Sequence, residues 1–244
     1  LPLSFWSSTA LEALNITDNM FKGSMPSTIS SFTALTALNL EFNNLTGTVP
    51  SEISSNTKLV SFTAGYNGLT GTFPTQIGVL TQLRELSLSQ NDFSGGVFPA
   101  SVVYAMTDLL SLELGGLHLT GTVSANIGVD LNKLVTLDVS DNMLHGSFPA
   151  VSSIVSLTNL QISGNSFSGT IPSDLNSLSN MILFGAGGNL FESTIPGALV
   201  GMNLLQEFIV AGNKLTGIVP TFLGLLTDLV SLDLGRNLFY STIP

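Results

Sequence analysis

The chain has 244 residues, of which 44% are hydrophobic and only 9% are charged, and its formal net charge is −10. Its six Lys and Arg residues supply no basic footprint for a nucleic acid, and the lack of cysteine excludes disulfides, thiolate chemistry and cysteine-type zinc sites. No apolar run approaches the roughly 18 residues of a transmembrane helix, so we expect no direct membrane insertion of this segment.

One unit recurs along the whole chain and is clearest in residues 35–50, LTALNLEFNNLTGTVP. With Leu35 as position 1, the unit has Leu at positions 4, 6 and 11, Asn at position 9, Gly at position 13 and Pro at position 16. A fixed period in the twenties indicates a stacked array. Ten repeats start at residues 11, 35, 59, 83, 109, 134, 157, 181, 205 and 229.

This pattern, L-x-x-L-x-L-x-x-N-x-L-x-G-x-I-P, resembles the leucine-rich repeat, and its Gly and I-P pair at a period near 24 resemble the plant-type extracellular subclass. The resemblance implies an α/β repeat class: a right-handed solenoid with a concave parallel β-sheet and short 3₁₀ or irregular convex segments. It also implies an extracellular or cell-surface protein without enzyme activity, similar to receptor-like ectodomains and polygalacturonase-inhibitor-like proteins. The ligands implied are peptides, a co-receptor ectodomain or a wall-degrading enzyme.

The elements of each repeat follow from the same pattern. Positions 3 to 8 alternate around two inward leucines, which is the period of a short strand. Each strand is expected to pair with the same strand of the next repeat, about 4.8 Å away, so that ten strands form one parallel sheet. Gly at position 13 allows a tight turn, and Pro at position 16 ends the pairing because it has no N–H. The remaining stretch predicts 3₁₀ turns or single helical turns on the convex side.

We expect residues 1–244 to form a single array, since a repeat protein has one elongated core. Residues 1–10 are interpreted as the tail of a preceding repeat, because Pro2 stands nine residues before Leu11. By resemblance, plant-type arrays carry cysteine pairs in their end caps, and this chain has none. It is therefore interpreted as a segment of a longer chain.

Position 9 predicts a structural ladder of asparagines. A buried amide has two donors and an acceptor, which can bond to turn backbone in its own and adjacent repeats. Unsatisfied backbone groups there would cost about 1–3 kcal/mol each. The position is Asn in nine of ten repeats, namely Asn19, Asn43, Asn67, Asn91, Asn142, Asn165, Asn189, Asn213 and Asn237.

Repeats four to six break this rhythm. Gly95 and Gly96 add a residue before Pro99, and repeat five has Leu117 in place of the ladder Asn. One interpretation is drift absorbed by a local bulge, and the other is a functional irregularity near the middle of the concave face.

Catalytic, metal and cofactor sites are not predicted. The two histidines, His118 and His145, fall on turns away from the strands, and neither lies in a nucleophile–base pattern. A metal centre needs several convergent ligands, which two isolated histidines do not supply.

The outward strand positions 3, 5, 7 and 8 form what we call the concave face, the surface that curved solenoids use for binding. Aromatic residues beside acids on such a face are typical of a protein or peptide contact. We predict a protein or peptide ligand, basic or mixed in charge, whose association is sensitive to salt; the alternative is an acidic face that is merely solvated. The predicted contact residues are Asp18, Glu41, Phe42, Tyr66, Glu85, Glu113, Asp138, Asp141, Gln161, Glu207 and Asp233.

Three further possibilities stay open. Low charge and uncapped ends also suit a self-associating structural or adhesive element of an extracellular assembly or filament. Threonines at positions 12 and 14, as in Thr46-Gly47-Thr48, predict a flat row of hydroxyls that resembles ice-binding solenoids or could face a polysaccharide. Small residues in repeats seven to nine, including Gly164, Gly185 and Gly187, predict a smooth patch on the concave face.

Two N-glycosylation sequons occur, at Asn15 and Asn44, and both fit a secreted protein. A glycan on Asn15 would block part of the concave face, whereas Asn44 falls on a turn. Asn44 is therefore the preferred candidate.

Overall fold

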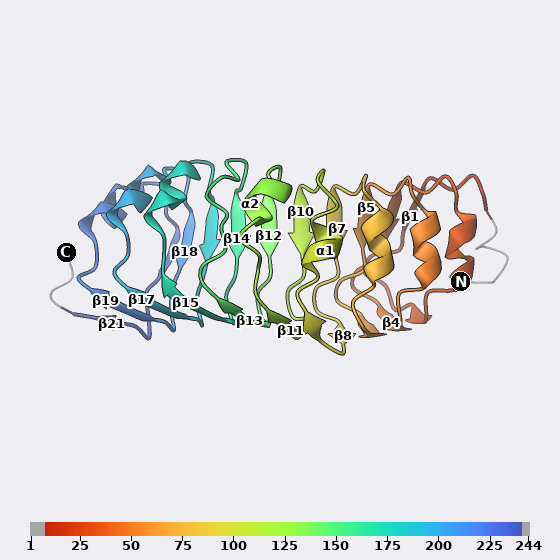
Figure 1. Ribbon diagram of the computed structural model, residues 1–244, viewed down its shortest axis with the longest axis horizontal. Coiled ribbons are helices and arrows are strands. Elements are labelled where there is room, and N and C mark those ends of the chain that lie inside the picture. Colours follow the sequence, from red (N-terminus) through yellow and green to blue (C-terminus); the bar gives the residue numbers. More distant parts are fainter. Residues whose placement is uncertain (1–7, 241–244) are drawn as a thin grey trace. The chain divides into compact units, whose positions relative to one another are not determined.

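The structure is a computed structural model that describes residues 8–240. Its repeats form two units, Leu1–His118 and Leu119–Pro244 (Figure 1). Most of the expected preceding repeat tail lies outside the described residues, and the assignment of one continuous array stays a prediction.

Each repeat of the Leu1–His118 unit contributes one three-residue strand to a parallel sheet. The pairing keeps like positions together, so that Leu38 at position 4 pairs with Phe62 at position 4 of the next repeat. Side chains of one repeat position therefore form a column across the unit. The strands are, in order, β1 (Ala13–Asn15), β3 (Ala37–Asn39), β5 (Ser61–Thr63), β7 (Glu85–Ser87) and β10 (Ser111–Glu113).

The Leu119–Pro244 unit repeats this arrangement. Leu160 pairs with Phe184, and Phe184 pairs with Phe208, again in parallel and at the same repeat position. These strands confirm the sheet that the 24-residue period predicts. They are β12 (Thr136–Asp138), β14 (Asn159–Gln161), β16 (Leu183–Gly185), β18 (Glu207–Ile209) and β20 (Ser231–Asp233).

Short strands at positions 10 to 14 form a second sheet in each unit, at the bottom edge of the ribbon in Figure 1. The first unit contains the four-stranded sheet of β2 (Lys22–Gly23), β4 (Asn44–Gly47), β6 (Gly68–Gly71) and β8 (Asp92–Phe93), and β9 (Gly96–Val97) belongs to the other, seven-stranded sheet. The second unit contains β11 (Leu119–Gly121), β13 (Met143–Gly146), β15 (Ser166–Thr170), β17 (Leu190–Ser193), β19 (Lys214–Gly217) and β21 (Leu238–Phe239).

Single helical turns complete the repeats on the convex side, as predicted. Most begin directly after the Pro at position 16, whose fixed φ suits the start of a helical turn. Among residues 8–240 no helix has the length and apolar character needed to cross a membrane. The turns are η2 (Ser27–Ser31), η3 (Ser51–Ser55), η4 (Thr75–Val79), α1 (Ala100–Val103), α2 (Ile127–Asp130), η5 (Ser173–Ser177), η6 (Gly197–Gly201) and η7 (Thr221–Leu225).

Inward leucines and phenylalanines fill the interior of both units. In repeat two, Leu35, Leu38 and Leu40 are at most 1% exposed. At position 11 of the second unit, Phe167 and Phe191 stack with ring centroids 6.5 Å apart. Full burial of each such side chain contributes about 1.5–3 kcal/mol, so the interior supplies most of the driving force for stacking the repeats.

Asparagine amides join each repeat to the one before it. The Nδ2 group of Asn67 donates to the carbonyl of Leu40 in the preceding repeat at 3.0 Å and to those of Ala64 and Gly65 in its own repeat at 3.2 and 3.1 Å. Its Oδ1 accepts from the amide of Leu45 in the preceding repeat at 2.9 Å. One side chain thus satisfies four backbone groups at the end of the strand.

The same four bonds recur at most ladder positions. They are made by Asn43, Asn91, Asn165, Asn189, Asn213 and Asn237. Asn142 also accepts from a backbone amide of the preceding repeat, that of Leu119, and Asn19 bonds to carbonyls of its own repeat. Leu117, which stands at this position in repeat five, is fully buried.

Replacing a ladder asparagine should destabilise the protein strongly. Asn67→Ala leaves four backbone groups without their amide partner, and we expect it to lower the free energy of unfolding by about 3 kcal/mol. Urea denaturation monitored by circular dichroism measures this change. Asn44→Ala, at an exposed position of the same unit, is the control and should change stability by less than about 0.5 kcal/mol. Equal effects of the two variants would contradict the structural role of Asn67.

Candidate functional site

The structure places all eleven predicted contact residues on the outward side of the strands or on the turn that follows, and none is buried. Asp18, Glu41, Phe42, Tyr66, Glu85 and Glu113 belong to the Leu1–His118 unit. Asp138, Asp141, Gln161, Glu207 and Asp233 belong to the Leu119–Pro244 unit.

Position 8, which ends this surface, has a left-handed backbone in every repeat. Its φ angle lies between 52° and 67° in all ten repeats. Glycine adopts this conformation freely, whereas a residue with a Cβ pays about 1–2 kcal/mol for it. Four repeats use Gly there, and the others carry Asp18, Phe42, Tyr66, Gln90, Asp141 and Arg236.

Phe42 and Tyr66 form a stacked aromatic pair at this strained position. Their ring centroids are 4.4 Å apart and their planes differ by 12°. Both side chains remain about half exposed, at 48% and 49%. Such a stack contributes about 0.5–1.5 kcal/mol, which offsets only part of the backbone cost of the two residues, about 2–4 kcal/mol together. The pair therefore does not stabilise the fold, and it presents a stacked apolar surface to solvent.

Serine hydroxyls orient two acids on the same face of this unit. Ser87 Oγ donates to Glu41 Oε1 at 2.7 Å, so that the Glu41 side chain crosses over Gly65 in the intervening repeat. Ser61 Oγ donates to Glu85 Oε2 at 2.6 Å. Each carboxylate retains acceptor capacity for further donors. The first unit thus combines two oriented carboxylates with the aromatic pair.

The second unit holds its polar groups differently. Asp138 Oδ1 accepts from both the amide and the hydroxyl of Ser140, at 2.8 and 2.6 Å. A Cβ at Gly185 would collide with the Gln161 side chain, which shows that this amide lies over the glycine.

The expected smooth patch is correspondingly smaller than predicted. Gly185 and Gly187 are buried. Gly164, with φ of 66°, lies against the Asp141 carboxylate. Longer neighbouring side chains fold over these glycines, and Gly188 is the exposed member.

The sequence analysis missed two features of the concave face. Arg236 occupies position 8 of repeat ten and is the one basic residue among the outward positions of the ten repeats. The left-handed backbone was also missed, although the four glycines and two aspartates at position 8 are a composition typical of it.

No catalytic or metal geometry accompanies this surface within the part of the chain that the structure describes. No group of three or more His, Cys, Asp or Glu side chains converges among residues 8–240. His118 and His145 are both exposed, the first between β10 and β11 within repeat five and the second on β13.

A second regular surface lies on the second sheet, and we call it the hydroxyl flank. Position 14 side chains lean along the array: the methyl group of Thr48 lies against Gly71, and that of Thr122 lies against Gly146. This contact fixes the side-chain direction. The flank comprises Thr46, Thr48, Thr70 and Thr72 in the first unit and Thr120, Thr122, Ser147, Thr170 and Thr194 in the second.

Both candidate glycosylation residues have exposed side chains. Asn15 ends β1, and its Oδ1 accepts from the amide of Thr17 at 2.9 Å. Asn44 begins β4, and it therefore lies on a short strand and not on a turn. Occupancy of either sequon stays a prediction.

Parallel strands at a 24-residue period, a leucine interior and an asparagine ladder give the chain the leucine-rich-repeat fold. The Leucine Rich Repeat family profile matches residues 34–56 and 156–178. The chain is 36% identical over 88 residues to Receptor-like protein 39 of Arabidopsis thaliana, which covers 36% of this chain and 10% of that protein. The chain thus spans only a small part of this relative.

Solved structures show the same fold over the whole chain. The plant peptide hormone receptor RGFR1, solved in complex with RGF2, superposes with a TM-score of 0.88 and 32% identity, covering all of this chain and 39% of the receptor chain. A plant ice-binding protein superposes with a TM-score of 0.80 and 25% identity, covering 95% of this chain and 74% of that chain.

Removing the aromatic pair should cost little stability. Phe42→Gly and Tyr66→Gly each lose part of the stack but relieve a left-handed backbone, so we expect the free energy of unfolding to change by less than about 1 kcal/mol. Phe62→Ala, in the fully buried interior of the same unit, should cost about 3–5 kcal/mol. Urea denaturation compares the three variants. A loss of several kcal/mol for Phe42→Gly would show that the pair is structural.

Proposed function

We propose that the chain is a non-enzymatic recognition module of an extracellular or cell-surface protein that binds a basic peptide segment on its concave face. The observation that carries this proposal is the Phe42–Tyr66 pair. These rings are half exposed, rigidly stacked and held on a strained backbone. A structural role does not account for that combination, whereas a contact surface uses rigid aromatic groups of this kind.

The neighbouring charges define the ligand chemistry. Glu41 and Glu85 are oriented by serine hydroxyls and keep free acceptor capacity. A lysine or arginine of the ligand can bind such a carboxylate while an adjacent apolar or aromatic side chain packs on the rings. The expected ligand is an extended segment with a basic residue next to an apolar one.

The comparisons support this proposal by analogy. RGFR1 is a peptide hormone receptor solved with its ligand RGF2, and a second neighbour, with a TM-score of 0.83, is PEPR1 solved with AtPEP1. The extracellular location and the absence of enzyme activity are proposed from the same analogy. The chain spans less than two fifths of either receptor chain.

Selection of random peptides displayed on phage tests the proposal. The immobilised protein should enrich peptides with Lys or Arg beside an aromatic or aliphatic residue, and raising the salt concentration should weaken their binding. Phe42→Gly combined with Tyr66→Gly should weaken the selected peptides at least about tenfold, or about 1.4 kcal/mol.

Tyr240→Gly removes an exposed aromatic side chain elsewhere and is the matched control. Peptides should bind this variant with unchanged affinity. The proposal fails if the selected peptides are not basic, or if they bind the double variant as tightly as the unmodified protein.

A second candidate function, ice binding, is supported by the hydroxyl flank. Threonine methyls are pinned on the glycines of the next repeat, so that hydroxyls recur at the repeat spacing of about 4.8 Å. A flat, regular and largely uncharged array of hydroxyls and methyls can match an ordered water lattice. The superposition on a plant ice-binding protein supports this second reading.

Thermal hysteresis of the purified protein measures ice binding directly. If the flank binds ice, Thr48→Lys with Thr72→Lys should abolish the hysteresis, because two long charged side chains interrupt the flat surface. Thr33→Lys, at an exposed convex position, should leave it intact. An unmodified protein without hysteresis would eliminate this second candidate and leave peptide recognition unaffected.

A further inference from the structure

Repeat four departs from the regular repeat at the second sheet. Gly96 occupies position 14, where eight of the other nine repeats have Thr or Ser, and Val97 is the extra residue before Phe98 and Pro99. A Cβ built on Gly96 would meet no atom within 4 Å, so the space of the missing side chain is empty. The following turn is α1, an α-helical turn, whereas the first three repeats have 3₁₀ turns.

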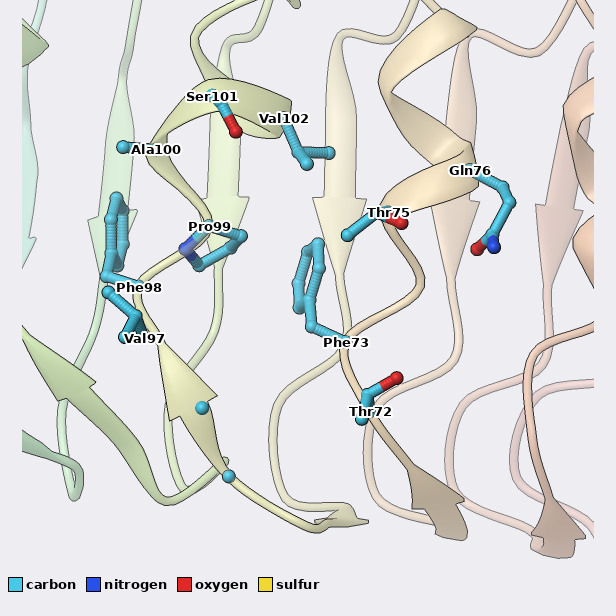
Figure 2. Close-up of a pocket in the computed structure, with 12 residues that line it drawn as sticks. Thr72, Phe73, Thr75, Gln76, Val97, Phe98, Pro99, Ala100, Ser101 and Val102 are labelled. Carbon is cyan, nitrogen blue, oxygen red and sulfur yellow. The ribbon is translucent and has the colours of Figure 1, made fainter.

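An open cavity lies beside these residues, between repeats three and four (Figure 2). Its volume is about 610 Å³, within the range of small-molecule sites. Figure 2 shows Phe73 and Phe98 rising on either side of Pro99, with Val102 reaching toward η4. Twelve residues line the cavity.

The lining selects for a neutral ligand. None of the twelve residues is charged, although the chain as a whole carries a formal charge of −10. Phenylalanine, proline and valine form the walls, while Thr72, Thr75, Gln76 and Ser101 supply uncharged hydroxyl and amide groups. A charged ligand that entered the cavity would lose hydration free energy, and no group of opposite charge in the lining would compensate for this loss.

A regular groove in the second unit provides the contrast. The equivalent space between repeats seven and eight has a volume of about 460 Å³. Its lining includes Asp174 and no aromatic side chain. This groove between two regular repeats is thus smaller than the cavity of repeats three and four, and it contains a carboxylate.

We propose that the cavity of repeats three and four binds a small neutral molecule with a ring-shaped apolar body and a hydroxyl group. The ring packs against the apolar wall to which Phe73, Val97 and Phe98 contribute, and the hydroxyl bonds to the threonine and serine hydroxyls at the rim. This site is on the second sheet and α1, apart from the concave face, and it goes beyond the proposed peptide recognition.

Nuclear magnetic resonance titration with p-cresol tests this site. Shifts should concentrate on the backbone amides of Gly95, Gly96 and Ser101, with a Kd on the order of 1 mM for so small a probe. Benzoate, which is similar in shape but charged, should produce shifts at least about tenfold weaker at the same concentration.

Two matched variants locate the binding. Thr75→Trp places a large ring at the rim of the cavity and should raise the Kd for p-cresol at least about tenfold. Ser173→Trp is the control, because Ser173 holds the same repeat position in the regular groove; its Kd should match that of the unmodified protein. Circular dichroism verifies that both variants fold.

Three results would overturn the proposal: p-cresol shifts spread equally over both grooves, equal shifts with benzoate, or undiminished binding by a folded Thr75→Trp variant. Each leaves the peptide experiment on the concave face untouched, since Phe42 and Tyr66 do not line this cavity.

Discussion

The hydrogen bonds of the ladder asparagines are the constraint on which the other features depend. A strand of three residues must end in a turn whose carbonyl and amide groups would otherwise be buried without partners. The amide of Asn67 satisfies four of these groups, two in its own repeat and two in the preceding one. Each repeat is therefore complete only when the next one is stacked on it, which is the nearest-neighbour stability of solenoid proteins.

This constraint also explains why recognition can vary so freely on the same scaffold. Packing restricts the inward positions to apolar residues such as Leu and Phe, and backbone hydrogen bonding restricts position 9 to Asn. The fold does not restrict the outward positions in this way. Position 8 is the exception, since the turn into the asparagine forces a left-handed backbone on it. Where glycine would suffice, Phe42 and Tyr66 occupy this position and stack in the open. The stack offsets only part of the backbone cost of these two positions.

The regular part of this design could be predicted from the sequence because it is periodic. Leucines at fixed spacing predict the strands, and the Asn and Pro positions predict the end of each strand and the start of the convex turn. Receptor ectodomains and an ice-binding protein share that scaffold. The 24-residue period therefore predicts the fold, but it does not distinguish peptide recognition from ice binding.

The irregular details depend on contacts that no period records. The Gln161 side chain lies over Gly185 of the next repeat, and this contact depends on the rotamer of Gln161. The hydrogen bond from Ser87 to Glu41 joins residues two repeats apart. In repeat four, the sequence shows one extra residue, but only the packing of Phe73, Phe98 and α1 turns that insertion into a cavity. From the sequence alone, the irregularity of repeat four can be interpreted either as drift or as a functional feature. The structure adds a cavity whose lining residues are uncharged.

Hydrogen exchange of side-chain amides tests the central role of the asparagines most directly. In the folded protein both Nδ2 protons of Asn67 are held by backbone carbonyls, whereas Asn44 is exposed at the start of β4. Nuclear magnetic resonance should find the Asn67 side-chain protons exchanging at least about a hundredfold more slowly than those of Asn44, the protection expected for groups released only by opening of the structure. Equal exchange rates for the two side chains would contradict the ladder and the stacking that depends on it.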